Sequence, residues 1–229
     1  MKQTILDFLD KIGVDNRFIS LWNEFVFINN LKFSRFSRRR EELFLGKFPE
    51  WKVIRSKVFQ KICIRASRVL SKSLNPGEKI FILKNNKCAD LALYLILEPY
   101  TRKYGIEIIT KEDNHLLEKD RSIDSISIDS IASSITLDQE IGNIIHQMFQ
   151  GERILPTNTN TEFNGVKIIY PLINIPDTWI ESWAKKYNLY CNISSICGDS
   201  KDLIRFLEEF IPDVRENMLK SARFVSEMG

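Results

Sequence analysis

Apolar and polar residues change their spacing around the middle of the chain in a way that predicts a strand, a loop, a helix and a second strand. A turn sequence at 75–77 (NPG) leads into four consecutive apolar residues, 80–83, which are typical of a strand buried on both faces. After a polar loop at 84–88, Asp90 precedes an apolar helical face and is a good N-cap residue. Residues 105–110 (GIEIIT) then predict the next strand. One such unit predicts an α/β fold with a parallel sheet, and a ligand site outside the carboxyl end of its first strand.

The same periodicity predicts the elements on both sides of this unit. We expect two short helices before residue 30, separated by Gly13, with Phe18, Leu21, Trp22, Phe25 and Val26 on one face of the second. A long helix is predicted from Trp51 to about residue 72. Further along, we expect a weak strand at 128–134, a helix at 137–150, a strand at 166–173, a helix after Pro176, and final helices at 199–224. The chain is therefore divided into a helical, basic N-terminal region, 1–74, and an α/β domain, 75–229.

Composition is consistent with one α/β domain and its N-terminal extension. The chain has 229 residues, 44% of them hydrophobic, with a mean hydropathy of -0.18. No apolar run approaches the roughly 20 residues of a membrane span. Asp7 and Asp10 interrupt the first apolar segment, which is typical of an amphipathic helix and not of a signal peptide. We therefore expect a soluble cytoplasmic protein that makes no contact with membranes.

Charge is distributed unevenly along the chain. Between positions 32 and 72 there are 13 Lys and Arg and 3 acidic residues, a net +10, whereas 73–229 carries a net −6. Clustered cations with few acids favour contact with phosphates, which makes RNA the expected partner of the basic segment. The candidate RNA-binding residues are Arg38, Arg39, Arg40, Lys52, Arg55, Lys57, Lys61, Arg65 and Arg68. The alternative is a solvated surface helix without a ligand.

Aromatic residues are interleaved with these charges. Phe33, Phe36, Phe44 and Phe48 could stack on RNA bases, or they could pack against the body of the protein. The sequence favours packing for the set as a whole.

The four cysteines, Cys63, Cys88, Cys191 and Cys197, contain no CxxC pair. Their wide spacing is not typical of a zinc site, so no metal site is predicted. In a reducing compartment they are expected to be free thiols. Cys191 and Cys197 could form a reactive pair, although buried structural thiols are the commoner outcome.

The loop after the first core strand has lost the residues that usually hold a phosphate. Phosphate-binding loops of this kind are rich in glycine, whose backbone N–H groups close around the anion at a helix N-terminus. Residues 84–89 contain no glycine and no Ser or Thr. The remaining candidates for a nucleotide contact are Asn85, Asn86, Lys87 and Asp90, with Lys84 as a further cation.

The order of these pieces resembles the PP-loop ATPase superfamily, and within it the tRNA 2-thiolation branch: the thiouridine synthetases and the cytosolic wobble-uridine thiolation pair. The resemblance covers about Lys52 to Phe224 and lies in the ordered set of motifs, of which only PLxxIP is intact. The matching segments are PGEKI at 76–80, the altered loop at 85–90, LAL at 91–93, GIEII at 105–109, LDQE at 137–140, the helix ending QG at 150–151, PLINIP at 171–176, and Cys197 in the segment SICG.

Several departures from the family pattern affect chemistry. The SGGxDS loop, which in the family binds the pyrophosphate of ATP during uridine adenylation, is replaced by NNKCAD at 85–90. The family's central CxxC is missing, since 125–134 holds only Ser, Ile, Asp and Ala, and Cys197 alone cannot ligate an iron–sulfur cluster. The N-terminal zinc-finger cysteines are absent too. Asp90, Asp138 and Cys197 are the vestigial catalytic candidates that remain.

The resemblance therefore implies a pseudoenzyme: a noncatalytic subunit of a tRNA 2-thiolation complex that binds tRNA and pairs with a catalytic PP-loop paralogue. A ubiquitin-like sulfur carrier would act through that partner, and no cofactor is expected on this chain. Two alternatives stay open. One is an active ATP-dependent adenylating enzyme in which Lys84 and Lys87 hold phosphate and Asp90 or Asp138 holds magnesium. The other is a stand-alone RNA-binding scaffold.

Overall fold

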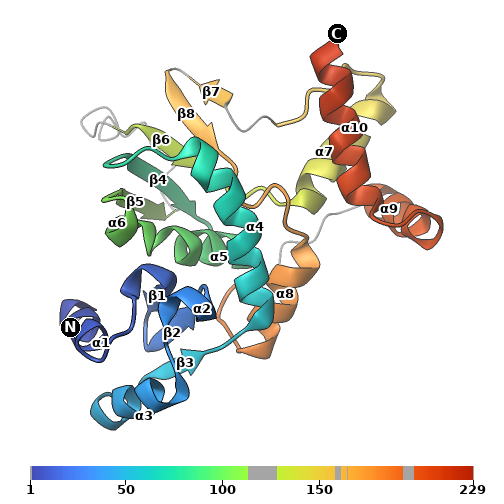
Figure 1. The fold of residues 1–229 in the computed structure, drawn as a ribbon. Helices are drawn as coiled ribbons and strands as arrows, with labels where there is room; N and C mark the ends of the chain where they lie inside the picture. The colour runs from blue at the N-terminus through green and yellow to red at the C-terminus, as the bar shows by residue number, and fades with distance from the viewer. Residues whose placement is uncertain (1, 113–127, 158–160, 164, 193–198, 229) are drawn as a thin grey trace.

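The computed structural model describes residues 2–112, 128–157, 161–163, 165–192 and 199–228. Its centre is a five-stranded sheet in the order β5-β4-β6-β8-β7, parallel except for β7 at one edge (Figure 1). The strands are β4 (Lys79–Lys84), β5 (Glu107–Glu112), β6 (Ser130–Ala132), β7 (Thr161–Phe163) and β8 (Val166–Ile169). The predicted parallel pairing of the first two core strands is confirmed, and so is the weak third strand.

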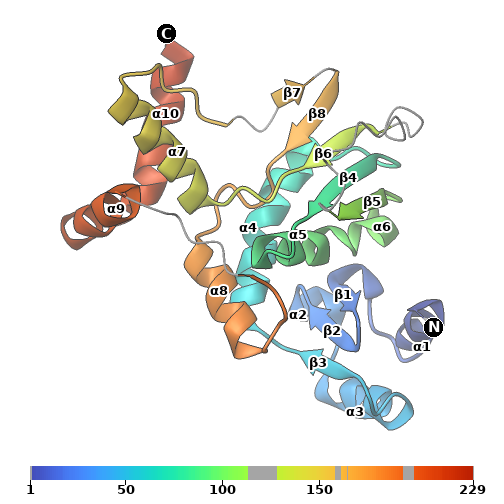
Figure 2. The same cartoon turned by 180° about the vertical axis from the view of Figure 1, so that it is seen from behind.

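Helices cover one face of the sheet. The cluster that covers it contains α4 (Lys57–Ser73), α5 (Cys88–Leu97) and α8 (Asp177–Lys186), which pack on Ile80 and Ile82 of β4. Both of these isoleucines are completely buried. Figure 1 shows α4 in front of the sheet, and Figure 2 shows the sheet from the opposite side.

The prediction that the first core strand is buried on both faces is wrong in part. Phe81 and Leu83 alternate with the two isoleucines and therefore point to the other face, where they are only half-buried. An unbroken apolar run reveals that neither face is polar, but it does not reveal how deeply each face is covered.

The N-terminal region differs most from its prediction. The second predicted helix is absent. After a short 3-10 helix that ends at Phe18, β1 (Ile19–Trp22) and β2 (Phe25–Ile28) make an antiparallel hairpin. The long helix expected from Trp51 is confirmed as α4, but it begins only at Lys57. The residues before it form β3 (Lys52–Ile54), which pairs in parallel with β2. The other elements of this region are α1 (Lys2–Lys11), η1 (Asn16–Phe18), α2 (Leu31–Ser34) and α3 (Arg38–Lys47).

Buried ionic and polar contacts fasten the N-terminal region to the body. Arg102 of α6 (Tyr100–Lys103) pairs with the buried Glu98 and donates to the carbonyl of Ile19 at 2.7 Å. Lys2 of α1 pairs with the same Glu98 at 2.7 Å. The apolar cluster that contains α4 and β4 includes residues on both sides of position 74. The division into domains at that position stays a prediction.

Three helices form a separate group beyond the β8 side of the sheet. They are α7 (Leu137–Gln150), α9 (Asp199–Phe210) and α10 (Val214–Met228), on the right in Figure 1. Their core joins α4 through the buried Val69, and Arg65 of α4 pairs with Glu216 of α10 at 3.3 Å. The predicted boundaries of α7 and α8 are confirmed, with Gly151 ending α7 at a φ of 68°. Among the described residues, no helix is long and apolar enough to cross a membrane.

Candidate functional site

The expected ligand position lies where β4 ends and α5 begins. From β4 the chain crosses to β5 on one side, and the next strand, β6, lies on the other side of β4. Such a reversal of strand order opens a crevice at the carboxyl ends of the strands in α/β sheets. The residues at this point, Asn85–Asp90, are called the corner below. Asn86 has a φ of 54°, a left-handed conformation that asparagine tolerates better than most residues.

In the corner, a carboxylate of the protein occupies the place where backbone N–H groups converge. Asp90 is 5% exposed, and its Oδ2 accepts the N–H of Asn85 at 3.0 Å and that of Lys87 at 3.3 Å. The prediction that Asp90 is the N-cap is wrong: Lys87 is the N-cap, and Asp90 is the third residue of α5, whose carboxylate accepts the N-cap N–H. Phosphate binding at a helix N-terminus needs such N–H groups to be available and the local charge to be positive. The Asp90 carboxylate satisfies these donors and adds a negative charge.

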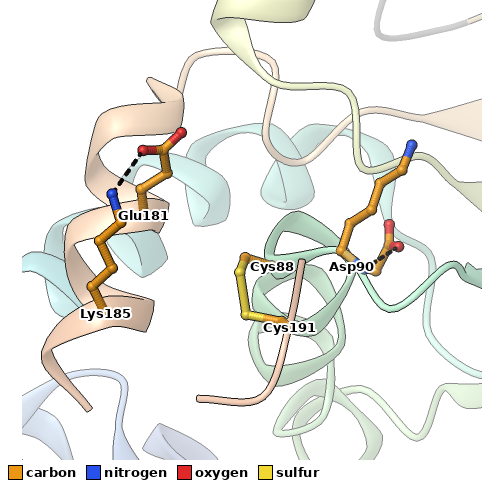
Figure 3. Close-up of a disulfide and its surroundings, with 6 residues drawn as sticks. Cys88, Asp90, Glu181, Lys185 and Cys191 are labelled. Carbon is orange, nitrogen blue, oxygen red and sulfur yellow. Dashed lines mark hydrogen bonds and ion pairs between the residues drawn. A yellow bond between two sulfur atoms is a disulfide. The ribbon is translucent and has the colours of Figure 1, made fainter. Parts of the chain in front are cut away.

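A disulfide closes the same corner. Cys88, the first residue of α5, is bonded to Cys191, with their Cα atoms 4.9 Å apart (Figure 3). The bond is reinforced by main-chain pairing, because the N–H of Cys88 donates to the carbonyl of Asn192 at 2.9 Å and the N–H of Asn192 donates to that of Asn86 at 2.7 Å. The expectation of free thiols is wrong for this pair, although Cys63 is free as predicted. The two cysteines are 103 residues apart in sequence, and only the tertiary fold brings them together.

The remaining open space at the corner is small. A cavity of about 210 Å³ lies beside it, lined by Asn86, Lys87 and Asp90 together with the aromatic residues Trp22, Tyr94 and Tyr190. Pockets for drug-sized ligands run from about 300 to 1,000 Å³. The exposed Lys87 side chain lines this cavity and brings a positive charge to it. The Lys84 side chain lies outside the described part of the structure.

Asp138, the other acidic candidate, belongs to a structural cluster at the start of α7. Its carboxylate lies 3.0 Å from Nε of Arg215 on α10 and accepts the N–H of Asp177 at 2.6 Å. Burial, together with the nearby Asp138 and Glu181 carboxylates, raises the pKa of Asp177 to about 6. Asp90 and Asp138 each serve a helix terminus. Among the described residues, no three His, Cys, Asp or Glu side chains form a metal-binding group.

The predicted RNA-binding residues fall into two sets. Arg40, Arg55 and Arg65 are partly buried and hold the protein together. Arg55 donates to Glu41 and to the carbonyl of Phe36, both at 2.7 Å, and Arg40 donates to the carbonyl of Arg35. Arg65 donates to the carbonyl of Asn174 at 2.9 Å and lies 4.4 Å from the ring centre of Trp179.

The other six are exposed. Arg38 and Arg39 start α3, and Lys52 lies in β3. Lys57, Lys61, Arg68 and the neighbouring Lys72 are exposed on α4 at a spacing that places them along one side of the helix. These four α4 residues are called the basic stripe below. The structure thus brings together part of the predicted set and assigns the rest to internal contacts.

Comparison with solved structures identifies the fold. The U34-tRNA thiolase NcsA from Methanococcus maripaludis, solved with its [4Fe-4S] cluster, resembles this chain with a TM-score of 0.58, over 79% of this chain and 83% of that one. Sequence identity is 14%, so the likeness shows the fold alone. The chain has a PP-loop ATPase-like α/β fold. No protein-family model and no curated protein matches the sequence.

The described residues do not fit a cluster of the kind that the thiolase holds. Iron–sulfur clusters are held by several thiolates. Cys88 and Cys191 are bonded to each other, and burial in the core raises the pKa of the Cys63 thiol and so disfavours its thiolate. Cys197 and His115 lie outside the described residues.

Proposed function

We propose that this chain is a noncatalytic subunit of a tRNA 2-thiolation complex, which binds tRNA and pairs with a catalytic PP-loop paralogue. It would act in the cytoplasm, and a ubiquitin-like sulfur carrier would reach the complex through the catalytic partner. The proposal is supported by the fold, which is similar to that of a U34-tRNA thiolase, and by the exposed basic stripe.

The observation that carries the noncatalytic assignment is the Asp90 carboxylate bound to the N–H groups of Asn85 and Lys87. A triphosphate in the corner would have to displace that carboxylate and would then meet its charge at close range. The Cys88–Cys191 disulfide and the pairing of Asn192 with the corner oppose the rearrangement that could relieve this conflict. A PP-loop fold without an open phosphate site is suited to assembly and not to adenylation.

The decisive experiment for this role is reconstitution. The purified chain is mixed with a PP-loop thiolase from the same cells and with tRNA, and the mixture is separated by size-exclusion chromatography. We expect a complex that contains both chains, and we expect cells without this protein to have less 2-thiouridine in bulk tRNA. Separate elution of the two chains, with unchanged 2-thiouridine, would reject the proposal.

Two other functions predict different results. An active adenylating enzyme would bind ATP at micromolar concentrations, and the Lys87→Ala variant would no longer bind ATP. A stand-alone RNA scaffold would lose RNA binding when the exposed Arg38 and Arg39 are changed to Glu, with no effect on thiolation. The closed corner argues against the first alternative, and the fold of the thiolase argues against the second.

A further inference from the structure

A second cavity lies far along α5 from the corner, between the N-terminal region and the body. Its volume is about 210 Å³. It is lined by residues of η1, α2, α4, α6 and the C-terminal side of α5, among them Arg17, Phe18, Phe33, Ile64, Tyr100 and Lys103. We propose that this cavity, called the base pocket below, binds one unpaired RNA base; the inference rests on the proposed tRNA-binding role and names a contact within it.

The first observation is an exposed aromatic ring at the pocket. Phe33 is 54% exposed, whereas Phe36 and Phe44, from the same interleaved set, are completely buried. Its ring centre is 5.3 Å from that of Phe18, so two rings lie together at the pocket wall. Bases of any sequence stack on such rings, and each stacked base contributes about 1–3 kcal/mol to binding.

The second observation is a cation above the aromatic wall. Nζ of Lys103 lies 5.6 Å from the ring centre of Phe18 and 5.2 Å from that of Tyr100. Within the described parts of the chain, Lys103 makes no ion pair with a carboxylate, and its side chain is exposed. Arg17 is also exposed, although Asp15 binds one edge of its guanidinium. A base that stacks on Phe33 would place its phosphate within reach of Lys103.

The third observation is that the pocket is continuous with the basic stripe. Ile64 and Ser67 line the pocket from α4, between Lys61 and Arg68 of the stripe. Leu31, at the start of α2, is joined to α4 by its N–H, which donates to Gln60. A strand of RNA running along α4 would therefore pass the pocket with cations on both sides.

This charge pattern favours RNA over a peptide. An apolar peptide would use the exposed Leu31, Phe33 and Ile64 but would have no need of the surrounding cations. The cavity is below the range for drug-sized ligands, so it suits a single base better than a whole nucleoside triphosphate. RNA-binding proteins recognise unpaired nucleotides by this combination of ring stacking and backbone cations.

Binding of a fluorescein-labelled 12-nucleotide oligo(U) to the full chain tests the proposal, with an RNA duplex of the same length for comparison. We expect Phe33→Ala to weaken oligo(U) binding by about 5- to 100-fold and duplex binding by less, because only the single strand offers free bases. Lys103→Gln should reduce the salt dependence of binding by about one phosphate contact. Phe206→Ala and Lys220→Gln, at exposed positions on α9 and α10, are the matched controls and should bind like the original chain.

Photo-crosslinking of oligo(U) that contains 4-thiouridine supplies an independent measurement, since it needs no variant. The pocket predicts crosslinked peptides from residues 17–33 and 100–103. Unchanged affinity in Phe33→Ala, or crosslinks confined to other regions, would overturn the base pocket and leave the proposed function standing. Failure of the chain to bind either RNA would overturn the pocket too, and the assembly and 2-thiouridine measurements would still decide the function separately.

Discussion

The corner after β4 and the exposed side of α4 both carry groups that can bind phosphate. In the corner these groups are bound within the protein, whereas on α4 they remain exposed to solvent. In the corner, backbone N–H groups are satisfied by Asp90 and by Asn192, and Cys88 is covalently fixed. On α4, the lysines and arginine of the basic stripe remain exposed. The difference teaches that a fold can lose a ligand site by satisfying its donors internally, while a neighbouring surface keeps its charges available.

Removal of the disulfide is expected to have the largest effect on the corner. A Cys88→Ala/Cys191→Ala variant should lose about 2–4 kcal/mol in its free energy of unfolding, because the bond closes a loop of about 100 residues in the unfolded chain. Urea denaturation monitored by circular dichroism measures this loss.

The control for that prediction is the original chain under reducing conditions, which should match the variant. A variant as stable as the oxidised original would show that the bond does not stabilise the corner.

Reversal of charge on the basic stripe is expected to have a slightly smaller effect, on binding. Lys57→Glu/Lys61→Glu/Arg68→Glu should weaken tRNA binding by about 100-fold or more at low salt, because three contacts with phosphates become repulsive. The loss of these contacts should also lower the salt dependence of binding. A fluorescence-anisotropy titration at several salt concentrations measures both quantities. Lys185→Glu/Lys186→Glu/Lys220→Glu changes the net charge equally elsewhere, and equal losses in the two variants would show that only overall charge matters.

Two arginines on the same helix sharpen the comparison further. Arg65→Gln should lower the free energy of unfolding by about 1–3 kcal/mol, because it removes a hydrogen bond to Asn174 and the stacking on Trp179. Arg68→Gln should change stability by less than about 0.5 kcal/mol and should weaken tRNA binding instead. Thermal unfolding and RNA titration of both variants check this, and equal stability losses would contradict the division of the basic residues into two sets.

The last expected effect concerns pH and appears only in acidic solution. The raised pKa of Asp177, about 6, means that the folded state binds this proton more tightly than the unfolded state, whose pKa is near 3.8. Its contribution to stability is therefore present below about pH 4 and is lost as pH rises to about 6. Asp177→Asn should flatten the dependence of the melting temperature on pH in this range and should be relatively more stable at pH 7 than at pH 4. If the melting temperatures of the two proteins change with pH in the same way, the pKa of Asp177 is not raised by the fold.

The sequence predicts correctly those helices and strands that have a strong pattern of apolar residues. The apolar run before Asp90 and the amphipathic stripes of α4 and α7 predicted the central elements, because burial of those side chains is what stabilises them. The hairpin at 19–28 was mistaken for a helix because both of its strands are largely buried, which removes the polar–apolar alternation of an ordinary strand. Asn23, with a φ of 50°, marks its turn and was the overlooked signal.

The sequence predicts where the candidate site lies, but it does not predict that Asp90 and the disulfide close it. Loss of glycine from the corner was visible in the sequence, whereas the engagement of Asp90 by two N–H groups depends on the loop conformation. The partner of Cys88 and the internal contacts of Arg55 and Arg65 depend on residues distant in sequence. Contacts of this kind follow from tertiary packing, which local patterns do not encode.

The central claim is that the corner no longer binds a triphosphate, and isothermal titration of the oxidised full chain with Mg-ATP tests it most directly. We predict no measurable heat of binding up to millimolar ATP, with Lys87→Ala behaving in the same way. Micromolar ATP binding that disappears in Lys87→Ala would contradict the account and would restore an ATP-dependent activity to this fold.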